Sequence, residues 1–166
     1  MKEERDTAAL SSAVFDLWRM AGKESELQVR GWSMRPLIDY EDTVVVKHTL
    51  DGIRPGSIIA FKRGRRIIIH RVLRKVRIGS ETIYVNKGDS NPRRDPLMRE
   101  RAVIGRVVAI VKKNNKRINV ESPLWRLMGY MMIVWGAAAS VLPSSVLELR
   151  FTKFFKRVMT RIVCVG

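Results

Sequence analysis

Serine, histidine and aspartate residues that could together transfer an acyl group stand in three separate segments of the sequence. Ser33 lies in Gly-Trp-Ser-Met-Arg-Pro, His70 lies in Ile-Ile-Ile-His-Arg-Val, and Asp95 follows the turn Lys-Gly-Asp-Ser-Asn. In such a set the serine attacks a carbonyl carbon, the histidine accepts its proton, and a carboxylate orients the imidazole. Only folding could bring these three residues together.

The segment around Ser33 favours a turn that exposes the hydroxyl. Gly31 gives the backbone freedom, and Pro36 favours a turn just after the serine. A serine between glycine and proline is, taken alone, more often an ordinary loop residue than a nucleophile. The chemical interpretation therefore depends on the histidine and the carboxylates.

His70 is the single imidazole in an otherwise aliphatic run. A polar ring in a buried strand is costly unless it is hydrogen-bonded, so we expect it to have a partner. Taken alone, such a residue is more often a satisfied core histidine than a base. Asp89 and Asp95 follow the next apolar segment in a polar turn, and either could orient the ring.

These residues fall among short apolar runs separated by Gly, Pro, Asn and Asp, a pattern that predicts β-strands. The predicted strands cover residues 43–46, 57–61, 66–72, 82–85 and 103–111. We therefore expect a compact domain of mainly β fold class, a β-rich α+β protein, over about residues 31–120.

Helical patterns flank this region. Apolar residues spaced by three and four over residues 7–21 predict a short amphipathic helix. Residues 127–142 carry no charge, but this run is slightly short for a membrane span, which needs roughly 20 residues. Residues 146–163 mix apolar and basic side chains, as a helix at a membrane surface does. The predicted organisation is an N-terminal helical segment (1–28), a catalytic domain (29–122) and a C-terminal membrane-associated helical segment (123–166).

The order of the motifs resembles that of the signal peptidase I family. Ser-Met-x-Pro, Asp-Thr-Val-Val-Val, His-Arg-Val and Lys-Gly-Asp-x-Asn with a following Asp occur in this order within residues 29–111. Bacterial members usually carry a lysine base where this sequence has His70. The chain is therefore similar to the histidine type of the endoplasmic reticulum, archaea and sporulating bacteria. The resemblance implies coiled antiparallel sheets with the nucleophile at the edge of a substrate groove.

The resemblance also implies a role for each matching residue. Ser33 would be the nucleophile, His70 the general base and Asp95 the orienting carboxylate, with Asp89, Met34 and Gly31 as supporting residues. Many relatives place a second oxyanion donor, a hydroxyl, two residues before the nucleophile, where this chain has Gly31. For Gly31 we therefore expect slower chemistry or a different donor. The relatives also carry a glycine where this chain has Glu41, so we expect that turn to differ.

Other basic residues are weaker candidates for the site. Lys62 would act as a base in the manner of self-cleaving repressors, which share this fold type, but His70 makes it unnecessary. Lys87 falls in the wrong segment of the pattern. His48, the other histidine, is expected to be a solvated residue at the end of a strand.

The composition restricts both chemistry and partners. Cys164 is the only cysteine, which excludes an intrachain disulfide and a paired-cysteine metal site. We expect no cofactor and no metal ion. The formal net charge of +16 is compatible with a polyanion or an anionic membrane surface. The arginines within residues 63–66 and 93–94 are expected at solvated hairpin tips, where they could also hold lipid phosphates.

Three functions fit this sequence. The favoured one is a membrane-associated serine endopeptidase that cleaves a leader-like peptide or preprotein. The second is a basic regulatory module that binds nucleic acid or an anionic membrane, and the third is an inactive scaffold. Nucleic acid is disfavoured, because residues 31–120 show no recognition-helix pattern and no stacking aromatics among the basic residues. Since the N-terminus lacks an apolar export signal, we expect a cytoplasmic catalytic domain, docked to the membrane through the C-terminal segment.

Overall fold

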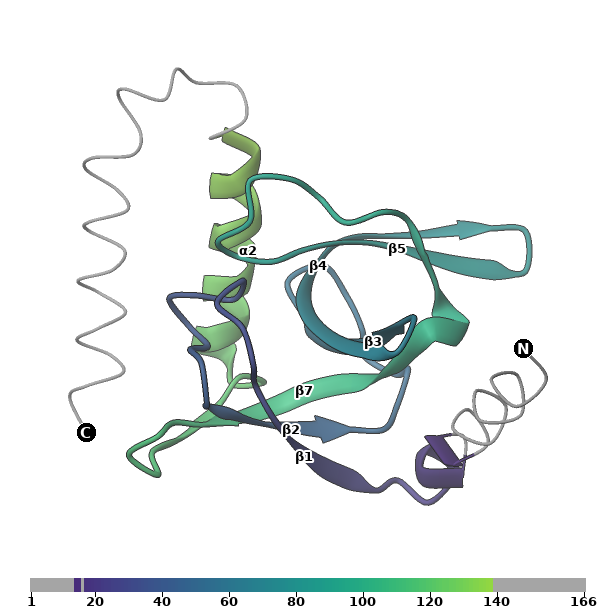
Figure 1. The fold of residues 1–166 in the computed structure, drawn as a ribbon. Helices are drawn as coiled ribbons and strands as arrows, with labels where there is room; N and C mark the ends of the chain where they lie inside the picture. Colours follow the sequence, from purple (N-terminus) through teal and green to yellow (C-terminus); the bar gives the residue numbers. More distant parts are fainter. Residues whose placement is uncertain (1–13, 16, 139–166) are drawn as a thin grey trace.

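The computed structural model describes residues 14, 15 and 17–138 of the 166-residue chain. One antiparallel eight-stranded sheet dominates this part of the molecule (Figure 1). Its strands are β1 (Glu24–Gln28), β2 (Thr43–Lys47), β3 (Ile58–Arg63), β4 (Arg66–Ile78), β5 (Glu81–Lys87), β6 (Met98–Arg99), β7 (Val103–Val111) and β8 (Arg117–Asn119). A 3-10 turn, η1 (Glu100–Ala102), precedes β7, and the helix α2 (Pro123–Ala138) follows the sheet. The predicted mainly β fold class is confirmed.

The sheet curls because its strands are irregular. The strand order is β1-β2-β7-β3-β4-β5-β6, and β8 also pairs with β7. The pairing register shifts within β2, β3 and β4, and such bulges bend a strand and increase its twist. β4 pairs with β3 through its first half and with β5 through its second half. It therefore links the centre of the sheet to the β4–β5 hairpin that projects in Figure 1.

The strand β3 is buried on both faces. Ile58 and Ala60 belong to one apolar cluster, whereas Ile59 and Phe61 belong to another. Successive side chains of a strand point to opposite faces, so β3 separates two cores. This double burial is the reason that its sequence is an unbroken apolar run rather than an alternation.

All five predicted strands are present, but three further strands were not predicted. β1 lies within residues 1–28, which were predicted to be helical, and only residues 14, 15 and 17–20 of the described part are helical there. β1 pairs with β2 along its whole length and keeps Glu24 and Glu26 exposed, which gives it a polar sequence. The two-residue β6 and three-residue β8 are too short for periodicity to reveal. The strand region therefore begins at Glu24 rather than near Gly31.

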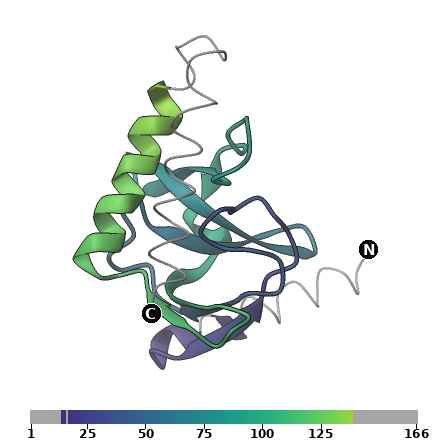
Figure 2. The ribbon, with the colours of Figure 1, turned by 90° about the vertical axis from the view of Figure 1, so that its left-hand side faces the viewer.

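α2 lies along one side of the sheet and packs on it through one face (Figures 1 and 2). Met128 and Gly129 are buried on that face, and a Cβ atom at Gly129 would lie 2.9 Å from the Gly56 carbonyl oxygen. The opposite face exposes an apolar stripe made of Leu124, Leu127, Met131 and Val134. Within residues 14, 15 and 17–138, no helix has both the length and the hydropathy to cross a bilayer. The predicted helix at 146–163 lies outside the described residues.

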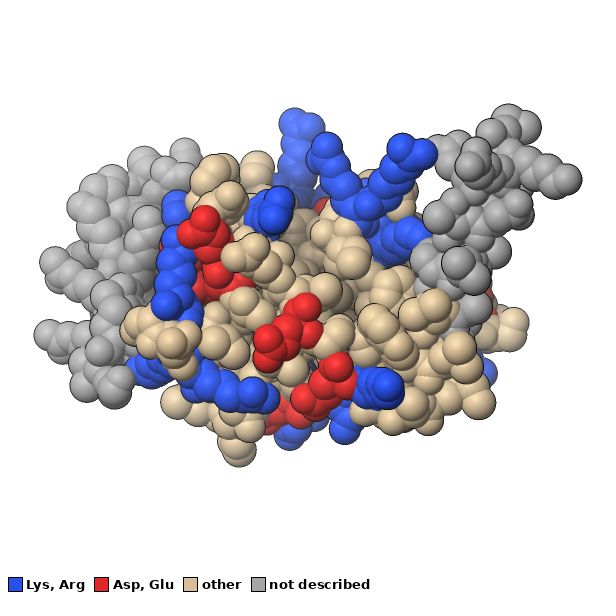
Figure 3. Space-filling model, turned by 60° about the horizontal axis from the view of Figure 1, so that its bottom comes forward, with Lys and Arg blue, Asp and Glu red and all other residues tan. Residues whose placement is uncertain are grey.

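The charged side chains are not spread uniformly over the surface. On the face shown in Figure 3, which is the underside of Figure 1, acidic residues occupy the middle and basic residues the margins. The exposed Glu24 and Glu26 of β1 contribute acidic groups to the sheet edge. The basic excess of the chain is therefore not concentrated at the centre of this face.

Candidate active site

Ser33 lies in a turn whose neighbours are anchored in the core. The Arg35 backbone N–H donates to the Trp32 carbonyl (3.2 Å), and the Ile38 N–H donates to the Met34 carbonyl (3.0 Å). Met34 and Ile38 are buried, whereas Ser33 is half-buried. The buried neighbours thus fix the turn that carries the serine. Met34, predicted to support the site, contributes by this anchoring.

His70 lies on β4, opposite Ile59 of β3, and its exposed fraction is 5%. Its Nε2 atom is 3.0 Å from the Ser33 Oγ atom, and its Nδ1 atom is 2.5 Å from an Asp95 carboxylate oxygen. An ionised carboxylate only accepts hydrogen bonds, so Nδ1 carries the proton of a neutral ring and Nε2 accepts from the serine hydroxyl. The fold therefore joins Ser33, His70 and Asp95 in one hydrogen-bonded chain.

Asp95 is held by backbone and side-chain contacts on two sides. Its N–H donates to the carbonyl of Asn86 at the end of β5 (2.9 Å). Its second carboxylate oxygen is 3.2 Å from a guanidinium nitrogen of Arg63. Arg63 was predicted to be a solvated hairpin-tip residue. It is exposed but paired, because the β3–β4 hairpin lies beside the loop that carries Asp95.

The turn after β5 packs directly against the serine segment. The Ser90 N–H donates to the Ser33 carbonyl (2.9 Å), and the Ser90 hydroxyl donates to the Trp32 carbonyl (2.8 Å). A Cβ atom at Gly88 would lie 2.7 Å from the Ser33 carbonyl oxygen and 2.9 Å from His70 Nε2. Only glycine fits this approach, which gives a physical reason for the Lys-Gly-Asp motif.

Asp89 lies beside the site rather than in the hydrogen-bonded chain. Both of its carboxylate oxygens accept from the Arg71 guanidinium, at 2.8 and 2.7 Å, and both side chains are buried. Arg71 also donates to the Gly56 carbonyl (2.9 Å). This bidentate pair ties the turn of Gly88 to β4 and to the segment under α2. Gly31, the third predicted supporting residue, has open space around it, since a Cβ atom there would meet nothing within 4 Å, so packing does not require glycine.

The prediction for His48 was wrong. This histidine is 1% exposed, and its ring stacks on Phe15 and meets the edge of Trp18, with centroid separations of 5.9 and 4.9 Å. Its Nε2 atom is hydrogen-bonded to the Ser25 hydroxyl (2.9 Å). Burial, with a smaller contribution from the Arg19 charge, lowers the pKa of His48 from its usual value. Helical residues that lie much earlier in the sequence cover the strand end, so strand periodicity alone could not reveal that His48 is buried.

Glu41 adopts a left-handed backbone conformation with φ of 66°. Its N–H donates to the Val29 carbonyl (2.8 Å), which closes the turn between β1 and β2. Left-handed backbone favours glycine, because a Cβ atom crowds the following carbonyl. The turn expected to differ from the family pattern therefore keeps a glycine-like backbone despite its glutamate.

Several site residues were not singled out from the sequence. Arg63, Arg71 and Ser90 were missed because their partners lie in distant segments. The available signal was that Arg71 directly follows His70 in the sequence and that Ser90 directly follows Asp89. Within the part of the chain that the structure describes, no three His, Cys, Asp or Glu side chains gather in a way that could hold a metal ion.

Comparison with protein families gives one match. The profile of the family described as Peptidase S24-like matches residues 2–108, which include Ser33, His70 and Asp95. The match covers about two thirds of the 166 residues. No curated protein sequence matches the chain.

Proposed function

The chain belongs to the Peptidase S24-like family, and on that premise we propose that it is a serine endopeptidase of the signal peptidase I type. It cleaves a leader-like or signal-like peptide through an acyl-enzyme. The observation that carries this proposal is the hydrogen-bonded chain from Ser33 through His70 to Asp95. A family fold alone would not specify activity, because function depends on the site.

In the proposed reaction Ser33 Oγ attacks the carbonyl carbon of the scissile bond, and His70 Nε2 takes the serine proton. Asp95 holds the ring in the tautomer that can accept this proton and stabilises the imidazolium that forms. His70 then donates the proton to the leaving amine, which departs and leaves an ester on Ser33. A water molecule, deprotonated by His70, attacks this ester, and the returning proton regenerates the serine hydroxyl.

The developing oxyanion needs at least one donor. The Ser33 backbone N–H is the candidate, and each such donor contributes about 3 kcal/mol to transition-state stabilisation. The Ser90 bonds to the Trp32 and Ser33 carbonyls fix the backbone of this segment. They support the proposal because a preorganised donor costs little reorganisation during the reaction.

The presence of His70 favours a signal peptidase function over a mechanism that depends on a lysine base. The hydroxyl of Ser33 is hydrogen-bonded to an imidazole, and a histidine base does not need the strong desolvation that a lysine base requires. The family also includes self-cleaving repressors, so the substrate could be another protein or a segment of this chain.

The experiment compares the native chain with Ser33→Ala and His70→Gln. Each protein is incubated with candidate leader peptides, and products are identified by mass spectrometry. Cleavage by the native chain alone is expected, and equal cleavage by all three would end the proposal. A further incubation, of native protein with intact Ser33→Ala protein, distinguishes self-processing from cleavage of an external substrate. Loss of a segment from the variant indicates self-processing between molecules, whereas cleavage of the added peptide indicates an external substrate.

We also propose that the protein docks on an anionic membrane surface through α2 and the basic segment after it. The exposed stripe of Leu124, Leu127, Met131 and Val134 supports this, because an apolar helix face adjoining basic residues is typical of interfacial binding. The test is sedimentation with vesicles rich in phosphatidylglycerol. Leu127→Glu should release the protein, whereas Ile78→Glu, at an equally exposed apolar residue on the β4–β5 hairpin, should not. Equal release by both variants would argue against docking through α2.

A further inference from the structure

Arg63 stands at the solvent side of the Asp95 carboxylate. Its guanidinium is 3.2 Å from the carboxylate oxygen that does not bind His70, and its side chain is 44% exposed while that of Asp95 is 9% exposed. The two oxygens of Asp95 thus have different partners, one cationic and one the imidazole. A carboxylate held at both oxygens has little freedom to rotate away from the ring.

A second set of contacts places Arg63 independently of its ion pair with Asp95. The guanidinium carbon lies 5.4 Å from the centroid of the Phe61 ring, within the range of a cation–π contact. Phe61 is buried, and its ring meets the His70 ring edge to face at a centroid distance of 6.1 Å. Arg63, Phe61, His70 and Asp95 therefore form a closed ring of contacts that joins β3, β4 and the loop after β5.

The charge of Arg63 opposes that of Asp95, so the guanidinium attracts the outer oxygen of the carboxylate. The other charged pair on this part of β4 is Arg71 with Asp89, and these two neutralise each other at contact distance. Arg63 is thus the cation that the described structure pairs with Asp95.

From this geometry we propose that Arg63 is a positioning residue, which holds the Asp95 carboxylate against the His70 ring. The inference deepens the proposed function and rests on it, since it assigns a residue to the same site. It does not make Arg63 a catalytic residue, because no described contact joins it to Ser33.

The test uses the full chain and three variants. Arg63→Met removes the charge and keeps a long apolar side chain on Phe61, Arg63→Lys restores the charge, and Arg66→Met is the matched control. Arg66 faces Arg63 across the same hairpin and is exposed. The Nδ1–H signal of His70, which reports its hydrogen bond with Asp95, is followed by NMR on protein labelled at histidine, with His48→Gln used to assign the signals.

For Arg63→Met we expect the Nδ1–H signal of His70 to move upfield and broaden, because a carboxylate released at its outer oxygen holds the ring less firmly. Arg63→Lys should restore most of the native signal, and Arg66→Met should leave the signal unchanged. A native signal in Arg63→Met, or an equal change in Arg66→Met, would overturn the proposal.

Activity provides the second readout. In an active enzyme Arg63→Met should lower kcat while KM stays constant, and Arg63→Lys should restore most of the loss. A native kcat in Arg63→Met would overturn the proposal. If the native chain cleaves no peptide, the proposed function fails, but the NMR signal still decides the role of Arg63.

Discussion

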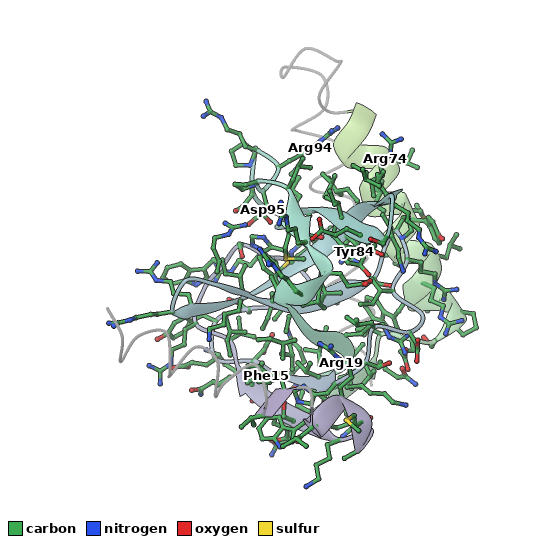
Figure 4. The ribbon with its side chains drawn as sticks, turned by 90° about the vertical axis from the view of Figure 1, so that its right-hand side faces the viewer. Phe15, Arg19, Arg74, Tyr84, Arg94 and Asp95 are labelled. Carbon is green, nitrogen blue, oxygen red and sulfur yellow. The ribbon has the colours of Figure 1, made fainter. Side chains whose placement is uncertain are left out.

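The described part of the molecule contains two serine–histidine pairs at opposite ends, and only one of these pairs has a carboxylate. His70 Nε2 is 3.0 Å from the Ser33 hydroxyl, and His48 Nε2 is 2.9 Å from the Ser25 hydroxyl. The Nδ1 atom of His70 is hydrogen-bonded to Asp95. The Nδ1 atom of His48 is buried beside the Ile104 backbone, and within the described residues it makes no well-formed hydrogen bond. In Figure 4, Asp95 lies toward one end, and Phe15 and Arg19, from the helix that covers His48, lie at the other.

The comparison shows that a hydroxyl at hydrogen-bonding distance from an imidazole does not define a catalytic site. The His48 ring is covered by Phe15 and Trp18. His70 is also buried, and Ser33 and Ser25 are both half-buried. What distinguishes the candidate site is a partner on each ring nitrogen of His70.

The largest expected difference between the pairs is in peptide cleavage. Ser33→Ala should lower kcat by at least about 10⁴-fold, because no nucleophile remains. Ser25→Ala should leave kcat within about twofold of the native value, since Ser25 contacts no residue of the hydrogen-bonded chain. Single-turnover cleavage assays on both variants measure the contrast, and similar losses in the two would remove the distinction between the pairs.

The next largest effect is expected from the Asp95 carboxylate. Asp95→Asn leaves the shape of the side chain but can present an amide to Nδ1, which favours the wrong tautomer of His70. We expect kcat at neutral pH to fall by about 10³–10⁴-fold with little change in KM. Asp51→Asn, at an exposed loop carboxylate, is the control. Steady-state kinetics with a thermal melt of each variant would detect a folding defect, and native kcat in Asp95→Asn would contradict the assignment.

The pH dependence of stability should instead show an effect at His48. Burial lowers the pKa of His48 below its usual value of 6.5, so the unfolded chain binds a proton at a higher pH than the folded chain does. The free energy of unfolding should therefore decrease as the pH falls below about 6.5. His48→Gln keeps a polar atom for Ser25 and should flatten this decrease. Urea unfolding between about pH 5 and pH 8 measures it, and an identical slope in the variant would show that other groups control the stability.

The smallest effect is expected at Ser25. Ser25→Ala removes one hydrogen bond from the buried His48 and should lower the free energy of unfolding by about 1 kcal/mol. Thr49→Ala, which alters an exposed hydroxyl that accepts from the Asp51 N–H, provides a comparison at the surface. A stability unchanged in Ser25→Ala would mean that the aromatic side chains alone fix the His48 ring.

Much of the sheet followed from local patterns. The strands β2 and β3 carry unbroken apolar runs, and β7 is apolar on both sides of Gly105 and Arg106, because both faces of these strands are largely buried. They could therefore be recognised without knowledge of the fold. β1 could not, because its exposed glutamates give it the composition of a surface helix or loop. The pairing with β2 that makes it a strand involves residues about twenty positions away.

The candidate site, like the sheet, could be predicted from the sequence only in part. Ser33, His70 and Asp95 could be selected from residue type and motif order, whereas Arg63 and the cover over His48 could not. Both depend on segments that approach only after the sheet has curled. The role of His70 as a base stays a prediction, and the surroundings of His48 were predicted wrongly.

Side-chain chemistry and hydrophobic periodicity are local properties, so residue types and their order indicated which residues are chemically able to act and which runs are buried. Which serine meets a histidine that also meets a carboxylate depends on the fold, since hydrogen bonds require atoms to lie within about 3 Å and chain order does not specify such distances. The bends in β4 and the close approach allowed by Gly88 bring the segments of Ser33, His70 and Asp95 to that range.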